Sequence, residues 1–274
     1  MTRGLVLAVV AVFGVASCSA TSEGPGGPPA SAGPASRPAV AAPPAGAAFD
    51  YQLGGAYEPP DGVRVLSRDR TADAAPGVYS ICYVNAFQAQ PGAEGEWDPD
   101  LLLRGTGGEP VIDEEWDEAL LDLRTENKRT RVAAKVGRWI DECAAKGYRA
   151  VEPDNFDSYT RSQDLLTADE AQAFFRLLAA HAHRAGLAIA QKNTSDLAPR
   201  RQANGADFAV VEECGEQDNC GDYTPYFADN VIVIEYTDEG LANACAKWGS
   251  LSIVRRDKDV LPQGSAGYVR ESCR

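Results

Sequence analysis

The sequence predicts an α/β protein, a (β/α)8 TIM barrel formed as a single domain by residues 48–274. Eight short apolar segments follow one another in this part of the chain, and helical patterns separate the later ones. Several segments are apolar throughout, as expected of parallel strands that are buried on both faces. A doubly wound open sheet is the alternative. No Gly-x-Gly-x-x-Gly follows the first segment, which weakens the nucleotide-binding version of that fold.

The first 17 residues have the pattern of an export signal. Arg3 is the basic start, and residues 5–15 form an apolar core that is too short to span a membrane. The signal ends in Val15-Ala16-Ser17-Cys18, which resembles the bacterial lipobox. By that resemblance Cys18 is lipidated and becomes the first mature residue. We therefore expect an exported protein, lipid-anchored on the extracellular face of the cell membrane. Ordinary signal cleavage that leaves a free Cys18 is the alternative.

Residues 18–47 are rich in Pro, Gly, Ala and Ser and have almost no bulky apolar side chain. Such a segment cannot bury enough apolar surface to fold, so it is expected to be a tether.

The barrel elements are expected in the following order. The predicted strands are residues 50–53, 63–67, 78–84, 150–152, 187–191, 208–212, 231–235 and 251–254. A helix is predicted over residues 168–185 because its apolar side chains have helical spacing, with Thr167 as N-cap and Gly186 as the stop. Another helical pattern runs through Val132 and Cys143 to Gly147, and shorter helices fit residues 197–202, 223–228 and 241–248. Residues 91–131 are long and mixed. They are expected to hold an insertion with a short helix near residues 116–123.

The composition is strongly acidic, with 40 Asp and Glu against 26 Lys and Arg. This balance argues against a nucleic-acid partner, whose phosphates need basic patches. It suits a cationic ligand, although acidity more often serves only solubility.

Six cysteines remain after Cys18, an even number that indicates disulfides in an exported chain. Six cysteines allow fifteen pairings. We favour Cys214–Cys220 because it closes a short loop, and Cys245–Cys273 because it ties down the C-terminus. Cys82–Cys143 then remains. The spacings do not match a zinc site.

Polar residues finish most of the predicted strands. In a parallel barrel these positions share one face, where the chemistry of TIM-barrel enzymes lies. Asp154 and Glu212 stand out, since two carboxylates that face each other are the machinery of glycoside hydrolysis.

Other chemistries fit less well. His181 and His183 lie in mid-helix and point to different faces, so neither a metal site nor a Ser-His-Asp triad is expected. No metal or cofactor is predicted. A divalent cation held by Glu152, Asp154, Asp157 and Glu235 remains open as an alternative.

Several motifs together resemble glycoside hydrolase family 114, the endo-α-1,4-polygalactosaminidase family. They are Glu-Pro-Asp-Asn-Phe-Asp-Ser-Tyr at 152–159, Lys192-Asn193, Glu212-Glu213-Cys214 with Cys220, Glu235-Tyr236, Tyr51-Gln52-Leu53 and Cys82-Tyr83. The resemblance covers residues 49–273. It implies a barrel that cleaves α-1,4-linked galactosamine polymers with retention, with Asp154 as nucleophile and Glu212 as acid/base. The adjacent Glu213 is the alternative, but the family acid lies two residues before the Cys.

The resemblance and the strand ends together give the expected substrate contacts. These are Gln52, Tyr83, Asn85, Asn155, Asp157, Tyr159, Lys192, Asn193, Glu213, Glu235 and Tyr236. One departure concerns residues 84–88: the family usually continues here with Ser, Gly and Glu, whereas this chain has Val-Asn-Ala-Phe-Gln. One wall of the cleft is therefore expected to differ. The expected partner is a cationic galactosamine polymer, cleaved by a monomer. A non-catalytic carbohydrate-binding lipoprotein of the same fold is the second hypothesis.

Overall fold

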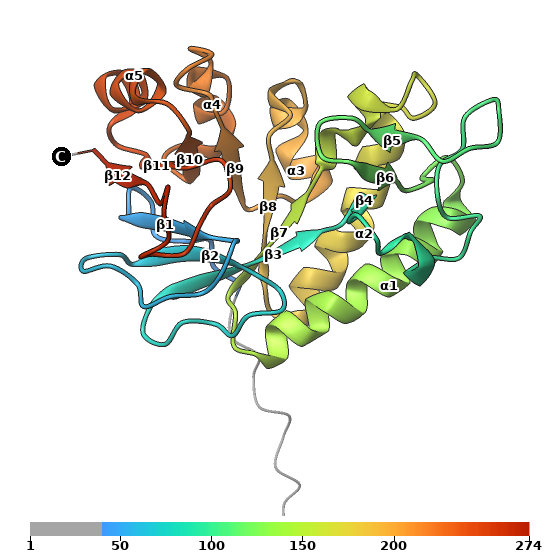
Figure 1. The fold of residues 1–274 in the computed structure, drawn as a ribbon, viewed down its shortest axis with the longest axis horizontal. Coiled ribbons are helices and arrows are strands. Elements are labelled where there is room, and N and C mark those ends of the chain that lie inside the picture. Colours follow the sequence, from blue (N-terminus) through green and yellow to red (C-terminus); the bar gives the residue numbers. More distant parts are fainter. Residues whose placement is uncertain (1–39, 274) are drawn as a thin grey trace, which may run out of the picture. The chain divides into compact units, whose positions relative to one another are not determined.

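Eight parallel strands form the centre of the fold in the computed structural model, which describes residues 40–273 (Figure 1). The predicted signal peptide, Cys18 and most of the tether lie outside this range. Each strand is parallel to the next along the chain, in the order β1-β2-β3-β7-β8-β9-β10-β11. Their bounds are β1 Phe49–Gln52, β2 Val65–Asp69, β3 Tyr79–Asn85, β7 Ala150–Asp154, β8 Ala188–Lys192, β9 Phe208–Glu212, β10 Val231–Glu235 and β11 Ser252–Arg256. The predicted (β/α)8 barrel is confirmed, and all eight predicted strands overlap an observed one.

The later strands are joined by helices, as predicted. Helix α1, Glu126–Ala145, links β3 to β7, and α2, Ala168–Ala185, links β7 to β8. Thr167 and Glu170 form a capping box at the start of α2, and Gly186 ends it in a left-handed conformation. Shorter helices follow: η2 Phe156–Arg161, η3 Ser195–Arg200, α3 Arg201–Asn204, η4 Cys220–Asp222, α4 Thr224–Phe227 and α5 Asp238–Trp248. Between β1 and β3 the chain crosses over without a helix, so the barrel is thinly covered on that side.

The insertion before α1 differs from the prediction. A helix was expected at residues 116–123, but β6, Glu118–Leu120, pairs there with β4, Gln88–Ala89, and β5, Ile112–Asp113. The 3-10 turn η1, Glu94–Glu96, lies between β4 and β5 of this small antiparallel sheet. Leu120 and Leu121 are both fully buried. Consecutive burial removes the one-sided pattern that an amphipathic helix would need.

A ninth strand, β12, Arg270–Ser272, was not predicted. It pairs antiparallel with β11 at the seam of the barrel. From β12 the Arg270 guanidinium donates a hydrogen bond of 3.0 Å to the carbonyl oxygen of Phe49 on β1. The buried Asp50 carboxylate lies 3.2 Å from Arg270 and 3.6 Å from Arg256. The last and first parallel strands are therefore connected through charge as well as through backbone.

The apolar core has two parts. One lies inside the barrel, where Phe49, Tyr51 and Phe208 face small residues such as Ala150 and Ala188. Large side chains opposite small ones fill a barrel without voids. The other lies between the strands and the helices and includes Phe156, Phe174 and Phe175. Among the described residues no helix is long and apolar enough to cross a membrane.

The domain begins earlier than predicted. Residues 41–47 were expected to belong to the tether, but Ala42 and Ala47 pack on the inner core. The Tyr79 hydroxyl also donates a hydrogen bond to the carbonyl oxygen of Ala41.

The three predicted disulfides are confirmed. Cys82–Cys143 ties β3 to α1, Cys214–Cys220 closes the loop after β9, and Cys245–Cys273 ties α5 to the segment after β12.

Candidate active site

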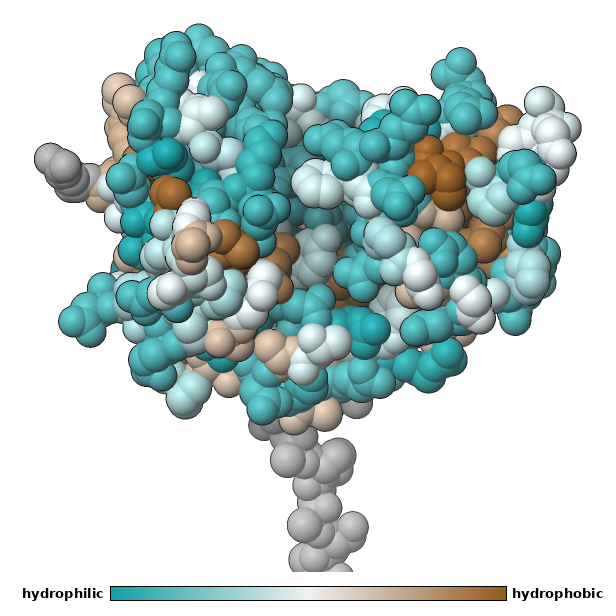
Figure 2. All heavy atoms as spheres, in the orientation of Figure 1, coloured by the Kyte–Doolittle hydropathy of each residue, from teal (hydrophilic) through white to brown (hydrophobic). Residues whose placement is uncertain are grey.

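A cleft of about 560 Å³ opens at the carboxyl ends of the parallel strands. Figure 2 shows a largely hydrophilic surface that is hollowed between the two upper sides of the molecule. Seven acidic side chains line the cleft, namely Glu115, Glu118, Asp154, Asp157, Asp196, Glu212 and Glu213. Only two basic ones, Arg161 and Lys258, do so. The cleft is therefore suited to a cationic ligand.

At the floor of the cleft, the Lys192 ammonium group lies between three carboxylates. Its Nζ is 3.1 Å from Asp154 Oδ2, 3.2 Å from Glu212 Oε2 and 3.2 Å from Glu152 Oε1. The Lys192 side chain is 1% exposed. Burial lowers the pKa of Lys192, but the carboxylates around it raise that pKa more, so the net shift is well upward. Lys192 is therefore a fixed positive charge between the predicted catalytic pair.

The distances to Lys192 limit the separation of the two carboxylates. The distance between Asp154 Oδ2 and Glu212 Oε2 cannot exceed the sum of their distances to Lys192 Nζ, which are 3.1 Å and 3.2 Å. Retaining glycosidases have carboxyl groups about 5–5.5 Å apart, and inverting ones about 6.5–9.5 Å. The upper limit for these nearest oxygens falls below the inverting range.

Other polar groups orient each carboxylate. The Asn155 backbone N–H donates to Asp154 Oδ1 at 2.6 Å. The Tyr236 hydroxyl donates to Glu212 Oε1, and the Asn193 amide donates to Glu212 Oε2 at 3.3 Å. Burial and the charge of Glu212 raise the pKa of Tyr236 well above its ordinary value, so this phenol stays a donor.

The backbone turns sharply after each of these strands. Asn155, Asn193 and Glu213 follow the last residues of β7, β8 and β9, and their φ angles are +66°, +48° and +58°. Asparagine tolerates this left-handed region better than most residues, whereas a glutamate there is strained. These left-handed residues lie at the candidate active site, since each directly follows a charged residue of the cleft floor.

Below the cleft floor, Glu152 is fully buried. Its Oε1 accepts a hydrogen bond of 2.8 Å from the Tyr51 hydroxyl, and its Oε2 accepts one of 2.8 Å from Ser67. Burial raises the pKa of Glu152, and Lys192 opposes that shift. Glu152 thus anchors Lys192 from the side away from the cleft.

Most predicted substrate contacts do line the cleft. They are Tyr83, Asn155, Asp157, Tyr159, Asn193, Glu213 and Tyr236. Lys192 lies beneath the lining. Asn85 lies behind it, where its side-chain oxygen accepts a hydrogen bond of 3.1 Å from Asn155.

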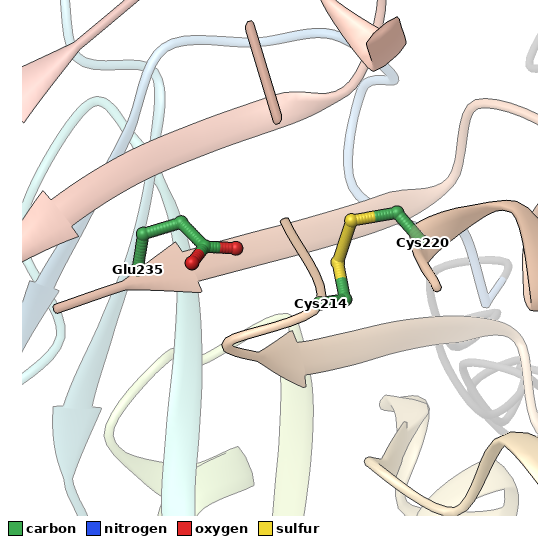
Figure 3. Close-up of side chains that lie close together, drawn as sticks. All are labelled: Cys214, Cys220 and Glu235. Carbon is green, nitrogen blue, oxygen red and sulfur yellow. A yellow bond between two sulfur atoms is a disulfide. The ribbon is translucent and has the colours of Figure 1, made fainter. Parts of the chain in front are cut away.

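Two predicted contacts lie elsewhere. The Gln52 amide is bonded to Asp50 and Arg68 within the barrel. The Glu235 carboxylate points to the loop closed by Cys214–Cys220 (Figure 3) and accepts from the backbone N–H of Gly215 at 2.6 Å. Both side chains are buried away from the cleft lining, so the prediction that they contact substrate is corrected. Both residues do follow apolar strands, which is why the strand-end pattern included them.

The two adjacent glutamates have different surroundings. Glu212 reaches Lys192, Tyr236 and Asn193, whereas Glu213 is paired with Lys258 at 3.3 Å on the rim. The shared ammonium therefore links Asp154 to Glu212.

The alternative cation site is not assembled. Asp157 is paired with Arg161, and Glu235 faces the disulfide loop. Cys214, Cys220 and Glu235 cluster closely enough to suggest metal ligands, but the two sulfur atoms are bonded to each other. A disulfide sulfur lacks the thiolate that a metal needs.

The sequence interpretation missed the wall contributed by the insertion. Glu115, Trp116, Glu118 and Arg161 line the cleft, and none of them ends a barrel strand. Trp116 is 51% exposed, which is unusual for tryptophan in a soluble domain. The run Glu-Glu-Trp-Asp-Glu was visible in the sequence, but its position over the cleft depends on how β4, β5 and β6 pair.

Comparison with known proteins agrees with this fold. The model of glycoside-hydrolase family GH114 matches residues 30–274. The crystal structure of Aspergillus fumigatus Ega3 in complex with galactosamine superposes with a TM-score of 0.68 at 22% identity, over 86% of this chain and 97% of that one. The glycoside hydrolase domain of PelA from Pseudomonas aeruginosa gives a TM-score of 0.53 at 16% identity, over 80% and 96%. A comparison with curated proteins finds no match. At these identities the two structures show a shared fold.

Proposed function

Because the chain belongs to glycoside-hydrolase family GH114, we propose that it cleaves α-1,4-linked galactosamine polymers internally and with retention. The observation that carries this proposal is the Lys192 ammonium group, which holds Asp154 and Glu212 together at the cleft floor. The galactosamine bound to Ega3 and the acidic lining of this cleft support an amino-sugar substrate.

In this mechanism the two carboxylates have separate roles. Asp154 attacks the anomeric carbon, while Glu212 donates a proton to the glycosidic oxygen and the leaving part of the polymer departs. Glu212 then removes a proton from water, and that water releases the sugar from Asp154. Asn155 and Lys192 orient Asp154 for attack. Tyr236 and Asn193 hold Glu212 on the opposite side of the bond that breaks.

The test is hydrolysis by the purified protein of partly de-acetylated α-1,4-galactosamine oligomers, with products read by mass spectrometry. Asp154→Asn and Glu212→Gln are the matched variants, since both keep the size of the side chain and remove its charge. We expect the parent to shorten the oligomers and both folded variants to lose at least roughly a thousandfold in kcat. NMR of the first-formed anomer tests retention.

A parent that binds the oligomers without cutting them would favour the second hypothesis, a carbohydrate-binding lipoprotein. If Glu213→Gln abolished turnover while Glu212→Gln did not, the acid/base assignment would be wrong.

Export and anchoring extend the proposal. A lipid on Cys18 would hold a monomeric enzyme at the extracellular face of the membrane, where a polymer can reach the cleft. Labelling with a radioactive fatty acid, compared between the parent and Cys18→Ser, tests the anchor.

A further inference from the structure

Glu118 is a carboxylate that the proposed mechanism does not use. It lies on β6, lines the cleft and is only 9% exposed. Two side-chain amides hold one of its oxygens: Asn85 donates to Oε2 at 2.7 Å, and Asn155 donates to Oε2 at 3.2 Å. Asn155 also binds Asp154 through its backbone N–H. Glu118 is thus fixed beside Asn155, whose backbone N–H orients the proposed nucleophile Asp154.

No cation pairs with Glu118 among the described residues. None of their Lys or Arg nitrogens lies within 4.0 Å of it, and none of their groups donates a hydrogen bond to Oε1. Arg161, the basic residue of this wall, is committed to Asp113 and Asp157 instead. Burial raises the pKa of Glu118, and the charges of Asp154 and Asp113 add to that shift. The hydrogen bond from Asn85 and the charge of Arg161 lower the pKa, but the net shift is upward.

A buried carboxylate without a cation is unfavourable, and a bound ammonium group would remove that penalty. The amine of a de-acetylated amino sugar would supply the missing charge and a donor for Oε1. A neutral acetamido group would supply at most an uncharged hydrogen bond and would need more room.

We infer that Glu118 binds the ammonium group of an amino sugar beside Asp154, and that it determines a preference for free amine over N-acetyl at this position. The inference rests on the proposed function for the identity of the polymer, but its binding test does not need turnover.

The test compares the parent with Glu118→Gln on two oligomers of equal length, one fully de-acetylated and one fully N-acetylated. Gln keeps an oxygen for Asn85 and Asn155 but loses the charge. We expect kcat/KM for the de-acetylated oligomer to fall roughly 10- to 100-fold, mainly through KM, as for loss of a hydrogen bond between charged groups. Values for the N-acetylated oligomer should change less than about threefold.

Glu114→Gln is the matched control, since Glu114 lies in the same insertion but is exposed to water and outside the cleft lining. Its charge is screened, so its removal should change the preference less than about threefold. Glu118→Asp keeps the charge on a shorter side chain and should retain part of the preference. It also serves as the second variant if Glu118→Gln does not fold.

Calorimetric binding of both oligomers is measured in the Asp154→Asn background. If the parent cuts neither oligomer but this background binds the de-acetylated one through Glu118, the proposed function fails and the inference survives. If the parent cuts and Glu118→Gln keeps the full preference, the inference fails alone. If the parent cuts neither oligomer and the Asp154→Asn background binds neither of them, both the proposed function and the inference fail.

Discussion

Replacing Lys192 with methionine should destabilise the barrel because it leaves a buried carboxylate without its cation. Lys192 lies 3.2 Å from Glu152, which is fully buried, and reaches Asp154 and Glu212 at 3.1 Å and 3.2 Å. Asp154 is 15% exposed and Glu212 is 23% exposed, so water can partly replace the ammonium at those two. Water cannot reach Glu152, which therefore dominates the effect.

Removal of one partner from a buried ion pair costs about 3–5 kcal/mol. For a domain of this size each kcal/mol lowers Tm by about 2–4 °C, so Lys192→Met should lower it by roughly 6–20 °C. Glu152→Gln should cost less, because Lys192 then keeps Asp154 and Glu212 as partners. The double variant should recover most of the loss. Its Gln can still bond to Tyr51 and Ser67, whose hydroxyl groups can act as donor or acceptor.

The assay is thermal and urea unfolding of the four proteins with their disulfides intact, followed by circular dichroism at neutral pH. The double-mutant cycle gives the coupling energy between Lys192 and Glu152 directly. The reasoning is refuted if Lys192→Met unfolds within about 1 kcal/mol of the parent. It is also refuted if the double variant is no more stable than Lys192→Met alone.

Further predictions concern the loop, the hydroxyl donor, a histidine and a disulfide. Gly215→Ala should lower activity at least roughly tenfold, because the added Cβ would displace the loop after Glu212. That Cβ would lie 2.5 Å from the Gly240 carbonyl oxygen and 2.8 Å from the Glu235 carboxylate. Normal hydrolysis rates for this variant would contradict the prediction. Tyr236→Phe should lower kcat by roughly 10- to 100-fold with little change in Tm, because Glu212 loses a hydrogen-bond donor. Steady-state kinetics measures this fall in kcat. The hydrogen bond to Asp207 raises the pKa of His183 above its ordinary 6.5, so its contribution to stability is complete below that pH and is lost as pH rises through the higher folded pKa. His183→Gln should therefore lower Tm at pH 6 and leave it nearly unchanged at pH 9, and an equal loss at both would count against this account. Replacing Cys245 and Cys273 with alanine should destabilise the fold by about 3 kcal/mol, as measured by urea unfolding, because the bond closes a loop with a sequence separation of 28.

The barrel could be predicted because several of its strands contain a continuous apolar run, a pattern that depends only on local sequence. β9 and β10 are the clearest cases, with Phe208–Glu212 and Val231–Glu235 predicted to the residue. The insertion could not be predicted in the same way. Its strands β4 and β5 have two residues each, too few to show a period of two, and β4 pairs with β6 far along the chain. The wall that holds Glu118 and Trp116 was therefore missed.

The role of Lys192 was also beyond the sequence, because it depends on the register between strands. Alternation along β7 puts Glu152 and Asp154 on the same face. The pairing of Ala150 with Ala188, continued upward, sets Asp154 level with Lys192.

On the other side of Lys192 the register is different. Lys192 pairs with Val210, so Glu212 stands two residues higher on the same face of β9. A shift of one residue in either pairing would turn a carboxylate out of the barrel and remove a partner of the buried ammonium. Local sequence identifies the acids and the lysine, but only the stagger of the closed barrel brings each acid within 3.2 Å of the lysine. The same stagger that closes the barrel therefore also sets the spacing of the proposed catalytic pair.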